Sequence, residues 1–479
     1  MKISKERMAK SVGVCTHFES CEIGWKIDRL LPILQDLGVG HVRQEIKWEW
    51  VEQEKGVYEI PALSMDWVDK VSQAGLGILL ILDYGNPLYE NPLDADGFAA
   101  YAGFMAERLK EYPIIAYEIW NEPTNFFFYE QYGGTWSGKE SSIWLEKFQE
   151  LISKSAEAIR KADPQATIIT NPGEPQFFHL AKKYPEAFKE IDGVSHHPYP
   201  VQLPPETLPL GGGEISADHG IVSADDDHSF LSLFRRTYEH GQKQLGKSLK
   251  LFSTEFGFST YNPAEKPGWA AGYTEFTQAC FMTRAVILNF VAGVESPCIY
   301  NLMDDGVGRD ECEENFGLVR NEKRNYDPKP SYAAIKRLIG LLGDDWEFVP
   351  EAPVKLQLPE QQFYRGLNWR EKAEEPFIRI DGPLLYWFKK GDQFICFFWK
   401  AGRLNAETPA PYARLNWEHA PDVKVVKIMD VVSGEELPIC IETPRRMGEY
   451  SMRLILTDLP VRPSPVAILW HSSSQPSAG

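Results

Sequence analysis

Two glutamates, Glu122 and Glu255, stand where predicted strands of the sequence end. The first lies in EIWNEP (118–123), directly after the apolar run PIIAY (113–117), and the second lies in STEFG (253–257). Two carboxyl groups held about 5–5.5 Å apart can break a glycosidic bond with retention of configuration, because one protonates the leaving oxygen while the other attacks the anomeric carbon. The two glutamates are our candidates for such a pair; the alternative is two unrelated carboxylates in surface loops.

Other polar residues could set the protonation states of this pair. Arg43 would favour the ionised form of the attacking carboxyl group, and Tyr199 could donate a hydrogen bond to it. Asn121 could hold the sugar 2-hydroxyl, where contacts strengthen in the transition state. The alternative for Arg43 is an internal ion pair with Glu45 or Glu118, and the two roles can coexist.

Short apolar stretches alternate with amphipathic ones from residue 11 to about 340. They are mostly continuous, as parallel strands covered on both faces should be. We predict strands at 11–18, 40–48, 77–84, 114–121, 166–171, 191–199, 250–256 and 294–301. Helical patterns lie at 25–38, 65–75, 98–110, 144–161, 276–289 and 331–343. Eight strands, each followed by a helix, predict an α/β fold of the (β/α)8 TIM barrel type.

Active sites of such barrels form at the carboxyl ends of the strands. The fourth and seventh strands face each other across the barrel, so Glu122 and Glu255 could approach one substrate atom from opposite sides. Charged and amide residues cluster at the predicted strand ends, whereas the strand bodies are apolar. From these ends we predict the substrate-binding residues Arg43, Trp48, Asp83, Asn121, His197, Tyr199 and Tyr300. For His197 and Tyr199 the alternative is a polar layer beneath the site.

Two aromatic-rich stretches follow the candidate glutamates and could form walls of a substrate cavity. FFFYEQYGGTW (126–136) supplies Trp136, and YNPAEKPGWAAGY (261–273) supplies Trp269. Aromatic faces stack on the C–H faces of sugar rings, and apolar residues in exposed loops need an explanation. The alternative is that these aromatic residues pack the loops against one another.

The sequence changes character after residue 345. Helical spacing disappears, and YWFKKGDQFICFFW (386–399) predicts two strands around a Lys-Gly-Asp turn. Further strand-like stretches follow, which together predict a C-terminal β-sandwich. We therefore expect a catalytic barrel at 1–344, a β-sandwich accessory domain at 345–471 and a disordered tail at 472–479.

The motifs WNEP (120–123) and TEFG (254–257) resemble the two signatures of glycoside hydrolase clan A. The stretch VRQEIKWEWVEQEKGVY (42–58) adds to the likeness, and His197-Pro198-Tyr199 is similar to the H-x-Y element of family 5. The wider layout most resembles family 39. This resemblance covers residues 11 to about 340. It implies a retaining β-glycosidase with Glu122 as acid/base, Glu255 as nucleophile and Asn121 as the ligand of the sugar 2-hydroxyl.

Composition argues against several classes of partner. The 479-residue chain has a formal net charge of −18, which disfavours a nucleic acid or an anionic membrane surface as partner. No apolar run approaches the length of a membrane span. The seven cysteines contain no C-x-x-C pair, so neither a disulfide scaffold nor a zinc site is expected. No signal peptide is visible, so we expect a cytoplasmic location, or secretion if the chain has been trimmed.

We expect no cofactor and no catalytic metal. Metal-dependent hydrolases built on barrels bind the metal through an H-x-H motif on the first strand, where this chain has only His17. The run Asp225-Asp226-Asp227-His228 lacks the glycine and the ligand spacing of a calcium loop. We interpret its carboxylates as complementing the N-terminus of a helix.

Two other functions are compatible with these residues. A carbohydrate-binding protein that has lost catalysis is one, but simple binding would not require the pair Glu122 and Glu255. A transglycosylase with the same residues is the other. A carbohydrate is the expected partner in every case. The sequence does not indicate the sugar, the linkage, exo or endo action, or an oligomeric state.

Overall fold

The computed structural model describes most of the chain. The described residues are 12–124, 128–133, 142–201, 203–208, 229–343, 346–358, 362–366, 378–402, 411–420, 423–446 and 452–472. All structural statements below concern these ranges. Residues 225–228, interpreted above as complementing a helix N-terminus, and the tail beyond 472 lie outside them.

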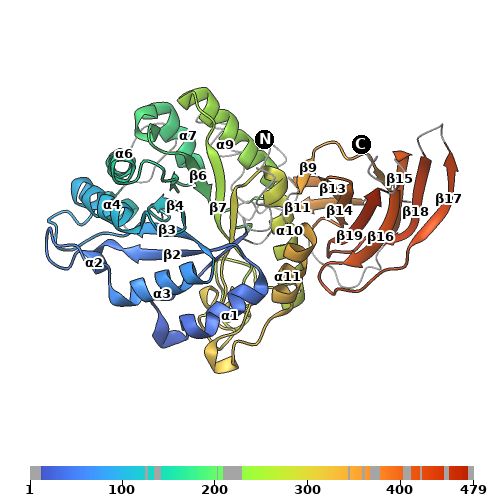
Figure 1. Ribbon diagram of the computed structural model, residues 1–479, viewed down its shortest axis with the longest axis horizontal. Helices are drawn as coiled ribbons and strands as arrows, with labels where there is room; N and C mark the ends of the chain where they lie inside the picture. Colours follow the sequence, from blue (N-terminus) through green and yellow to red (C-terminus); the bar gives the residue numbers. More distant parts are fainter. Residues whose placement is uncertain are drawn as a thin grey trace, which may run out of the picture.

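Eight parallel strands close into a barrel in the order of the sequence (Figure 1). They are β1 (Gly13–Cys15), β2 (His41–Lys47), β3 (Gly77–Asp83), β4 (Ile114–Ile119), β5 (Ile168–Thr170), β6 (Gly193–His196), β7 (Lys250–Phe256) and β8 (Ser296–Ile299). Each strand lies inside one of the eight stretches predicted from sequence. The predicted TIM barrel is therefore confirmed.

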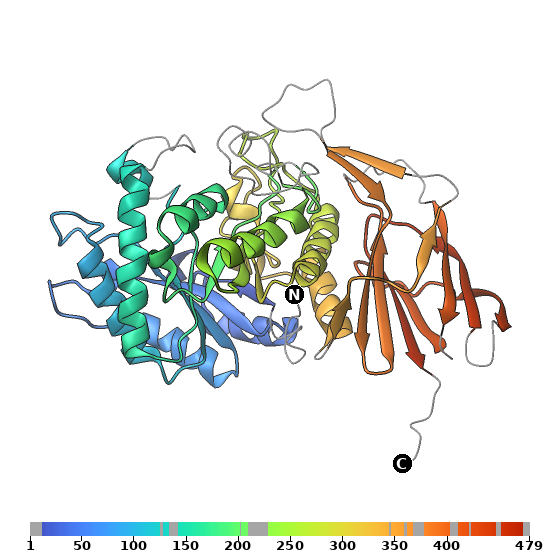
Figure 2. The same ribbon diagram turned by 90° about the horizontal axis from the view of Figure 1, so that it is seen from above.

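Helices surround the barrel on its outside (Figures 1 and 2). The α-helices are α1 (Ile27–Leu37), α2 (Trp48–Val51), α3 (Ala62–Gln73), α4 (Ala95–Leu109), α5 (Phe128–Tyr132), α6 (Ile143–Ala162), α7 (Glu174–Lys183), α9 (Phe230–Leu245), α10 (Glu275–Ala292) and α11 (Pro330–Leu342). Short 3-10 helices are η1 (Cys21–Ile23), η2 (Pro185–Phe188), η3 (Glu313–Asn315) and η4 (Glu322–Arg324). All six predicted helices are present; α2, α5, α7 and α9 were not among them.

The inside of the barrel is built in layers, because side chains two residues apart on a strand point to the same side. An apolar cluster that includes Ala116 of β4 and Phe252 of β7 forms one layer. Two residues further along the same strands, Glu118 and Thr254 form a polar layer above it. The strand bodies are thus not wholly apolar, contrary to the sequence-based expectation.

Two antiparallel sheets follow the barrel. One has the strand order β16-β19-β14-β13-β9 and the other β10-β15-β18-β17, while β11 and β12 form a separate pair. Their bounds are β9 (Glu347–Val349), β10 (Lys355–Gln357), β11 (Gln362–Gly366), β12 (Ile378–Gly382), β13 (Leu384–Lys390), β14 (Gln393–Trp399), β15 (Tyr412–Ala420), β16 (Val423–Asp430), β17 (Cys440–Arg446), β18 (Met452–Pro460) and β19 (Val466–Ser472). The predicted strand pair around the Lys-Gly-Asp turn is confirmed as β13 and β14.

The two sheets share one hydrophobic core. At its centre the ring of Trp387 from β13 meets the edge of Trp417 from β15 at 5.0 Å and lies 4.9 Å from Trp470 of β19. Large aromatic side chains at this contact bury much apolar surface, which is the main source of stability for such a layer pair.

Helices α10 and α11 lie between the barrel and these sheets (Figures 1 and 2). The fully buried Arg284 of α10 donates hydrogen bonds to the carbonyl oxygens of Lys400, Gly402 and Pro463, at 2.9, 3.1 and 2.5 Å, and pairs with Glu206 at 3.4 Å. A buried guanidinium requires such partners, so this contact fastens the C-terminal sheets to the barrel.

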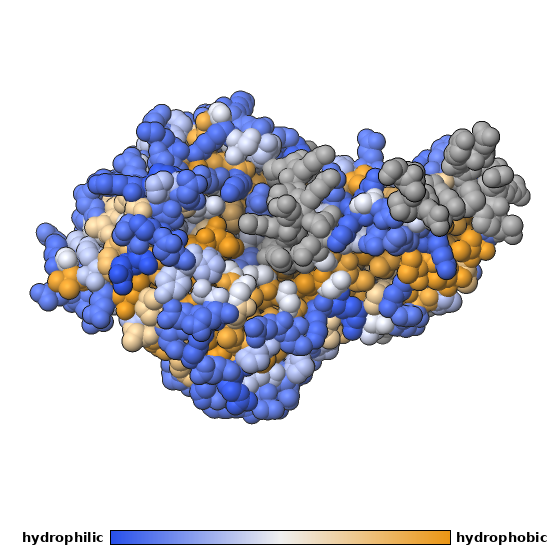
Figure 3. All heavy atoms as spheres, viewed as in Figure 1, coloured by the Kyte–Doolittle hydropathy of each residue, from blue (hydrophilic) through white to orange (hydrophobic). Residues whose placement is uncertain are grey.

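None of the described helices combines the length and the hydrophobicity that a membrane crossing requires. The seven cysteines, all within the described ranges, have free thiols. Over the barrel the surface is mostly hydrophilic, and hydrophobic residues interrupt it in places (Figure 3).

Candidate active site

A cavity of about 570 Å³ is lined by residues from the carboxyl ends of the barrel strands and the loops that follow them. Eight of the residues predicted from sequence line it: Arg43, Asn121, Glu122, His197, Tyr199, Glu255, Trp269 and Tyr300. The volume is in the range of pockets that hold small ligands. Residues far apart in the sequence are therefore brought together as the barrel prediction requires.

A sharp turn after β4 presents Asn121 and Glu122 to the cavity. Trp120 and Glu122 have positive φ angles, 67° and 44°, a conformation that costs non-glycine residues about 1–3 kcal/mol each. The buried ring of Trp120 meets Phe128 at 4.6 Å and Phe98 at 5.6 Å. We infer that this aromatic packing holds the turn in place, so the side chain that follows Trp120 is rigidly aimed.

Arg43 connects three groups beneath the cavity. Its guanidinium donates to Glu118 at 2.7 Å, to Glu255 at 2.6 Å and to the Asn121 side-chain oxygen at 2.9 Å. Both predicted roles of Arg43 are therefore seen, since it forms an internal ion pair with Glu118 and also contacts Glu255. A charged donor at this distance forms a strong, charge-assisted hydrogen bond with Glu255.

Tyr199 supplies the second donor to Glu255. Its hydroxyl lies 2.8 Å from Oε2, while Arg43 occupies Oε1. Burial, together with the negative charge of Glu255, raises the pKa of Tyr199 well above its ordinary value, so the phenol stays a donor. Each oxygen of the Glu255 carboxyl group thus accepts one hydrogen bond.

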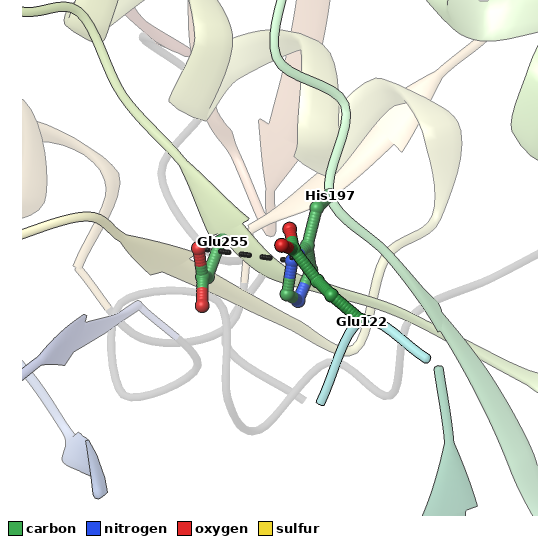
Figure 4. Close-up of side chains that lie close together, drawn as sticks. All are labelled: Glu122, His197 and Glu255. Carbon is green, nitrogen blue, oxygen red and sulfur yellow. Dashed lines mark hydrogen bonds and ion pairs between the residues drawn. The ribbon is translucent and has the colours of Figure 1, made fainter. Parts of the chain in front are cut away.

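His197 lies between the two candidate glutamates (Figure 4). Its Nδ1 is 2.7 Å from Oε1 of Glu122 and 3.7 Å from Oε2 of Glu255, and its Nε2 is 3.0 Å from the Thr254 hydroxyl. Burial acts to lower the pKa of His197, but the carboxyl groups of Glu255 and Glu122 outweigh it and leave that pKa raised. The imidazole is therefore a ready proton carrier next to both carboxyl groups.

The two carboxyl groups come close together. One oxygen of Glu122, one oxygen of Glu255 and a ring nitrogen of His197 all lie within 4.8 Å of one another. Inverting glycosidases hold their carboxyl groups about 6.5–9.5 Å apart to leave room for a water molecule, and retaining ones about 5–5.5 Å apart. The oxygen–oxygen approach between Glu122 and Glu255 is therefore closer to the separation in retaining enzymes than to that in inverting ones.

The same three groups could in principle ligate a metal ion. One feature disfavours this, because the Arg43 guanidinium places a positive charge 2.6 Å from Glu255. Two carboxyl groups beside an imidazole can instead exchange protons with one another and with a ligand.

Aromatic residues form one wall of the cavity. Trp269 has 42% of its surface exposed, stacks on Phe316 at 5.9 Å, and its indole N–H donates to Glu313. Tyr300 packs edge-on against Tyr199 at 6.4 Å. The open face of Trp269 offers a stacking surface for a sugar ring.

Two predicted substrate-binding residues do not line the cavity. Trp48 is fully buried, packs on Tyr89 at 4.8 Å and donates to Glu52, because the chain turns into α2 right after β2 and carries the indole into the core. Asp83 is also fully buried, and its carboxyl oxygens have no hydrogen-bond partner within the described residues. Its neighbour Tyr84 lines the cavity instead.

The remaining predictions fall on the aromatic stretch after Glu122. Trp136 lies outside the described residues. Phe128 of the same stretch is fully buried against Trp120, so this residue packs the loop instead of facing substrate. At Phe128, therefore, the packing alternative holds.

Sequence reasoning missed several residues of the site. Glu313 lines the cavity from η3, in the long segment after β8. It does not follow a predicted strand, so its position in the sequence did not indicate a site residue. Thr254 and Ser195 lie within strands and join the polar layer through hydrogen bonds to Glu118. Strand periodicity places them inward, but only the closed barrel brings them to the same carboxyl group.

Comparison with known families gives a direct match. The model described as Cellulase (glycosyl hydrolase family 5) matches residues 5–280, more than half of the chain. It confirms the resemblance to clan A that the strand-end motifs indicated. No curated protein matches this chain in sequence.

Solved structures share the fold. A family 39 glycoside hydrolase from the gut symbiont Bacteroides cellulosilyticus WH2 superposes with a TM-score of 0.67 at 18% identity, covering 97% of this chain and 81% of that one. A glucosidase from Croceicoccus marinus superposes with a TM-score of 0.55 at 11% identity, covering 99% and 97%. At these identities the likeness shows a common architecture that includes the C-terminal sheets.

Proposed function

The chain belongs to glycosyl hydrolase family 5 and is a glycoside hydrolase, and on this basis we propose that it cleaves β-glycosidic bonds with retention of configuration. In this proposal Glu255 is the nucleophile and Glu122 the acid/base. The observation that carries it is the approach of one oxygen of Glu122 and one oxygen of Glu255 to within 4.8 Å of each other beside His197. Such a short approach agrees with the separation of about 5–5.5 Å in retaining enzymes better than with the 6.5–9.5 Å of inverting ones.

The surroundings of the two carboxyl groups support opposite roles. Glu255 accepts from Arg43 at 2.6 Å and from Tyr199 at 2.8 Å, so both of its oxygens are held in place for attack as a nucleophile. Glu122 instead bonds to His197, a group that can both give and take a proton. Two carboxyl groups in environments this different are the usual basis of an acid and nucleophile assignment.

The reaction follows in two steps. An oxygen of Glu255 forms a bond to the anomeric carbon while the bond to the leaving oxygen breaks, and Glu122 gives its proton to that oxygen. Water then attacks the anomeric carbon, its proton returns to Glu122, and the bond to Glu255 breaks. The sugar is released with its original configuration because each step inverts the carbon once.

Asn121 is positioned to hold the sugar. Its oxygen accepts from Arg43 at 2.9 Å, and its amide donates to the Tyr84 hydroxyl at 2.9 Å. These bonds fix the amide plane and leave its second N–H as a donor, which supports the proposed contact with the 2-hydroxyl.

We also infer that the residues beyond the barrel form an accessory β-sandwich, in line with the expected boundaries 1–344 and 345–471. The shared core of the two sheets supports this. Arg284 and the bond from the Trp399 indole to Glu206, at 2.7 Å, support a fixed position against the barrel.

The stereochemical course tests the proposal. An aryl β-glycoside that the protein hydrolyses is first found in a panel of glucosides, galactosides, mannosides and xylosides. Its turnover is then followed by proton NMR, and the β-anomer of the free sugar is expected to appear first, before mutarotation. First appearance of the α-anomer would show an inverting reaction and would rule out the assigned roles.

A further inference from the structure

We propose that Thr254 and Glu118, which lie outside the cavity, are positioning residues that fix a proton on Nε2 of His197 and so make Nδ1 and Glu122 share one transferable proton. This inference rests on the proposed role of Glu122 as acid/base. It concerns the layer beneath the cavity, since neither Thr254 nor Glu118 lines it.

The layer is a buried chain of hydrogen bonds. Glu118 and Thr254 are both fully buried. The Thr254 hydroxyl donates to Oε1 of Glu118 at 2.7 Å, and Nε2 of His197 lies 3.0 Å from the same hydroxyl. The chain thus runs from Glu118 through Thr254 and His197 to Oε1 of Glu122.

The direction of each bond follows from the number of protons available. Glu118 is the ion-pair partner of Arg43 at 2.7 Å, so its carboxylate oxygens only accept. Thr254 has one hydroxyl proton, which goes to Glu118. Its oxygen must then accept from His197, because a hydroxyl offers one donor and further lone pairs. Nε2 of His197 therefore carries a hydrogen.

The state of Nε2 decides what Nδ1 can do. In the neutral ring, Nδ1 has no hydrogen and accepts from a protonated Glu122; in the charged ring it donates to an ionised Glu122. In both states the pair holds one proton that can move to the substrate. The other neutral tautomer would put its hydrogen on Nδ1, and the pair would then hold an ionised Glu122 with no proton to give.

The remaining charged groups near His197 do not change the number of protons that His197 and Glu122 share. Glu255 faces it at 3.7 Å and is held by Arg43 and Tyr199, which already occupy its two oxygens. Glu174 also contributes to the local charge. None of these groups donates a hydrogen bond to Nε2, which stays with Thr254.

The proton balance closes over both steps. When the glycosidic bond breaks, the shared proton goes to the leaving oxygen and Glu122 is left ionised beside an unprotonated Nδ1. A lone pair facing a carboxylate makes that carboxylate a better base. When water attacks the glycosyl-enzyme, its proton restores the shared proton between Glu122 and His197.

The test removes the hydroxyl while keeping the shape of the side chain. Thr254→Val takes the acceptor from Nε2, whereas Thr254→Ser keeps it. Ser195→Ala is the matched control, because the Ser195 hydroxyl also donates to Oε1 of Glu118, at 2.6 Å, but its hydrogen bonds within the described residues go to Glu118 and Thr170 and not to His197. The probes are two aryl β-glycosides of a sugar that the native protein hydrolyses, with 2,4-dinitrophenol and phenol as leaving groups.

We expect Thr254→Val to lower kcat/KM for the phenyl glycoside by roughly 10- to 100-fold, part of the usual contribution of general acid catalysis. For the dinitrophenyl glycoside, which needs no protonation, kcat/KM should change by no more than about twofold, within ordinary context effects. Thr254→Ser should restore the phenyl rate, and Ser195→Ala should leave the ratio of the two rates at its native value. A merely structural loss would lower both substrates together.

An unchanged ratio in Thr254→Val, or an equal fall for both substrates, would overturn the inference. Glu122→Gln measured on the same two substrates separates this outcome from a failure of the proposed function. If Glu122→Gln shows the leaving-group dependence and Thr254→Val does not, only the relay is wrong. If Glu122→Gln shows none, the acid assignment itself is wrong.

Discussion

Glu255→Gly should lose turnover by about 10⁴-fold or more, the scale seen when a covalent nucleophile is removed. The reason is that no other group in the described part of the site is placed to attack the anomeric carbon: Glu255 is held by Arg43 and Tyr199 with its carboxyl group 3.7 Å from His197. Initial rates on the panel substrate measure the loss. The control variant is Glu107→Gln, which should keep native activity. Glu107 lies on the exposed face of α4, and within the described residues it pairs with Lys110 alone.

Sodium azide should partly restore the Glu255→Gly variant. The anion fits the space left by the carboxyl group and attacks the same carbon once, so the product should be the α-glycosyl azide. Circular dichroism and the melting temperature check that the variant is folded, since Arg43 keeps Glu118 as its partner. Native-like turnover without azide would remove Glu255 from the mechanism.

Glu122→Gln should show the second large effect, and its size should depend on the leaving group. For poor leaving groups kcat/KM should fall by roughly 10²- to 10⁴-fold, the contribution of a positioned general acid. Activated dinitrophenyl glycosides should form the glycosyl-enzyme at nearly the native rate and then accumulate it, because water lacks its base. Azide, which needs no base, should release the β-glycosyl azide.

Opposite azide anomers from the two variants would separate the two roles. In Glu255→Gly, azide takes the place of the carboxylate and attacks the substrate from one face of the sugar. In Glu122→Gln, azide takes the place of water and attacks the glycosyl-enzyme from the other face. Identical anomers from both variants would mean that the assignment of acid and nucleophile to Glu122 and Glu255 fails. Both outcomes are read from one NMR spectrum of each product.

The fold was predictable because its signals are local. Continuous apolar runs located all eight strands, and polar residues directly after them located Glu122 and Glu255 at facing strands. Two predicted residues do not line the cavity, because a position at a strand end does not show what a side chain packs against: Asp83 is fully buried next to Tyr84, and Trp48 begins a short helix that carries it into the core. Position at a strand end is not enough; the direction of the side chain decides.

The polar layer beneath the cavity could not be predicted in this way. Glu118, Ser195 and Thr254 come from three strands, and the sequence gives no sign that they meet at one carboxyl group. The alternative partner proposed for Arg43 did include Glu118, and the structure shows that the same guanidinium also contacts Glu255. Side-chain networks of this kind depend on rotamers that only the closed barrel fixes.

Covalent trapping tests the central claim most directly. The native protein is incubated with a 2-deoxy-2-fluoro β-glycoside of the panel sugar bearing a dinitrophenyl leaving group, whose fluorine slows hydrolysis of the intermediate, and is then digested and analysed by mass spectrometry. One fluoroglycosyl group per chain, bound to Glu255 in the peptide that contains STEFG, is the predicted result. Inactivation through another residue, or steady turnover that yields the α-sugar with no adduct, would contradict a retaining mechanism on Glu255.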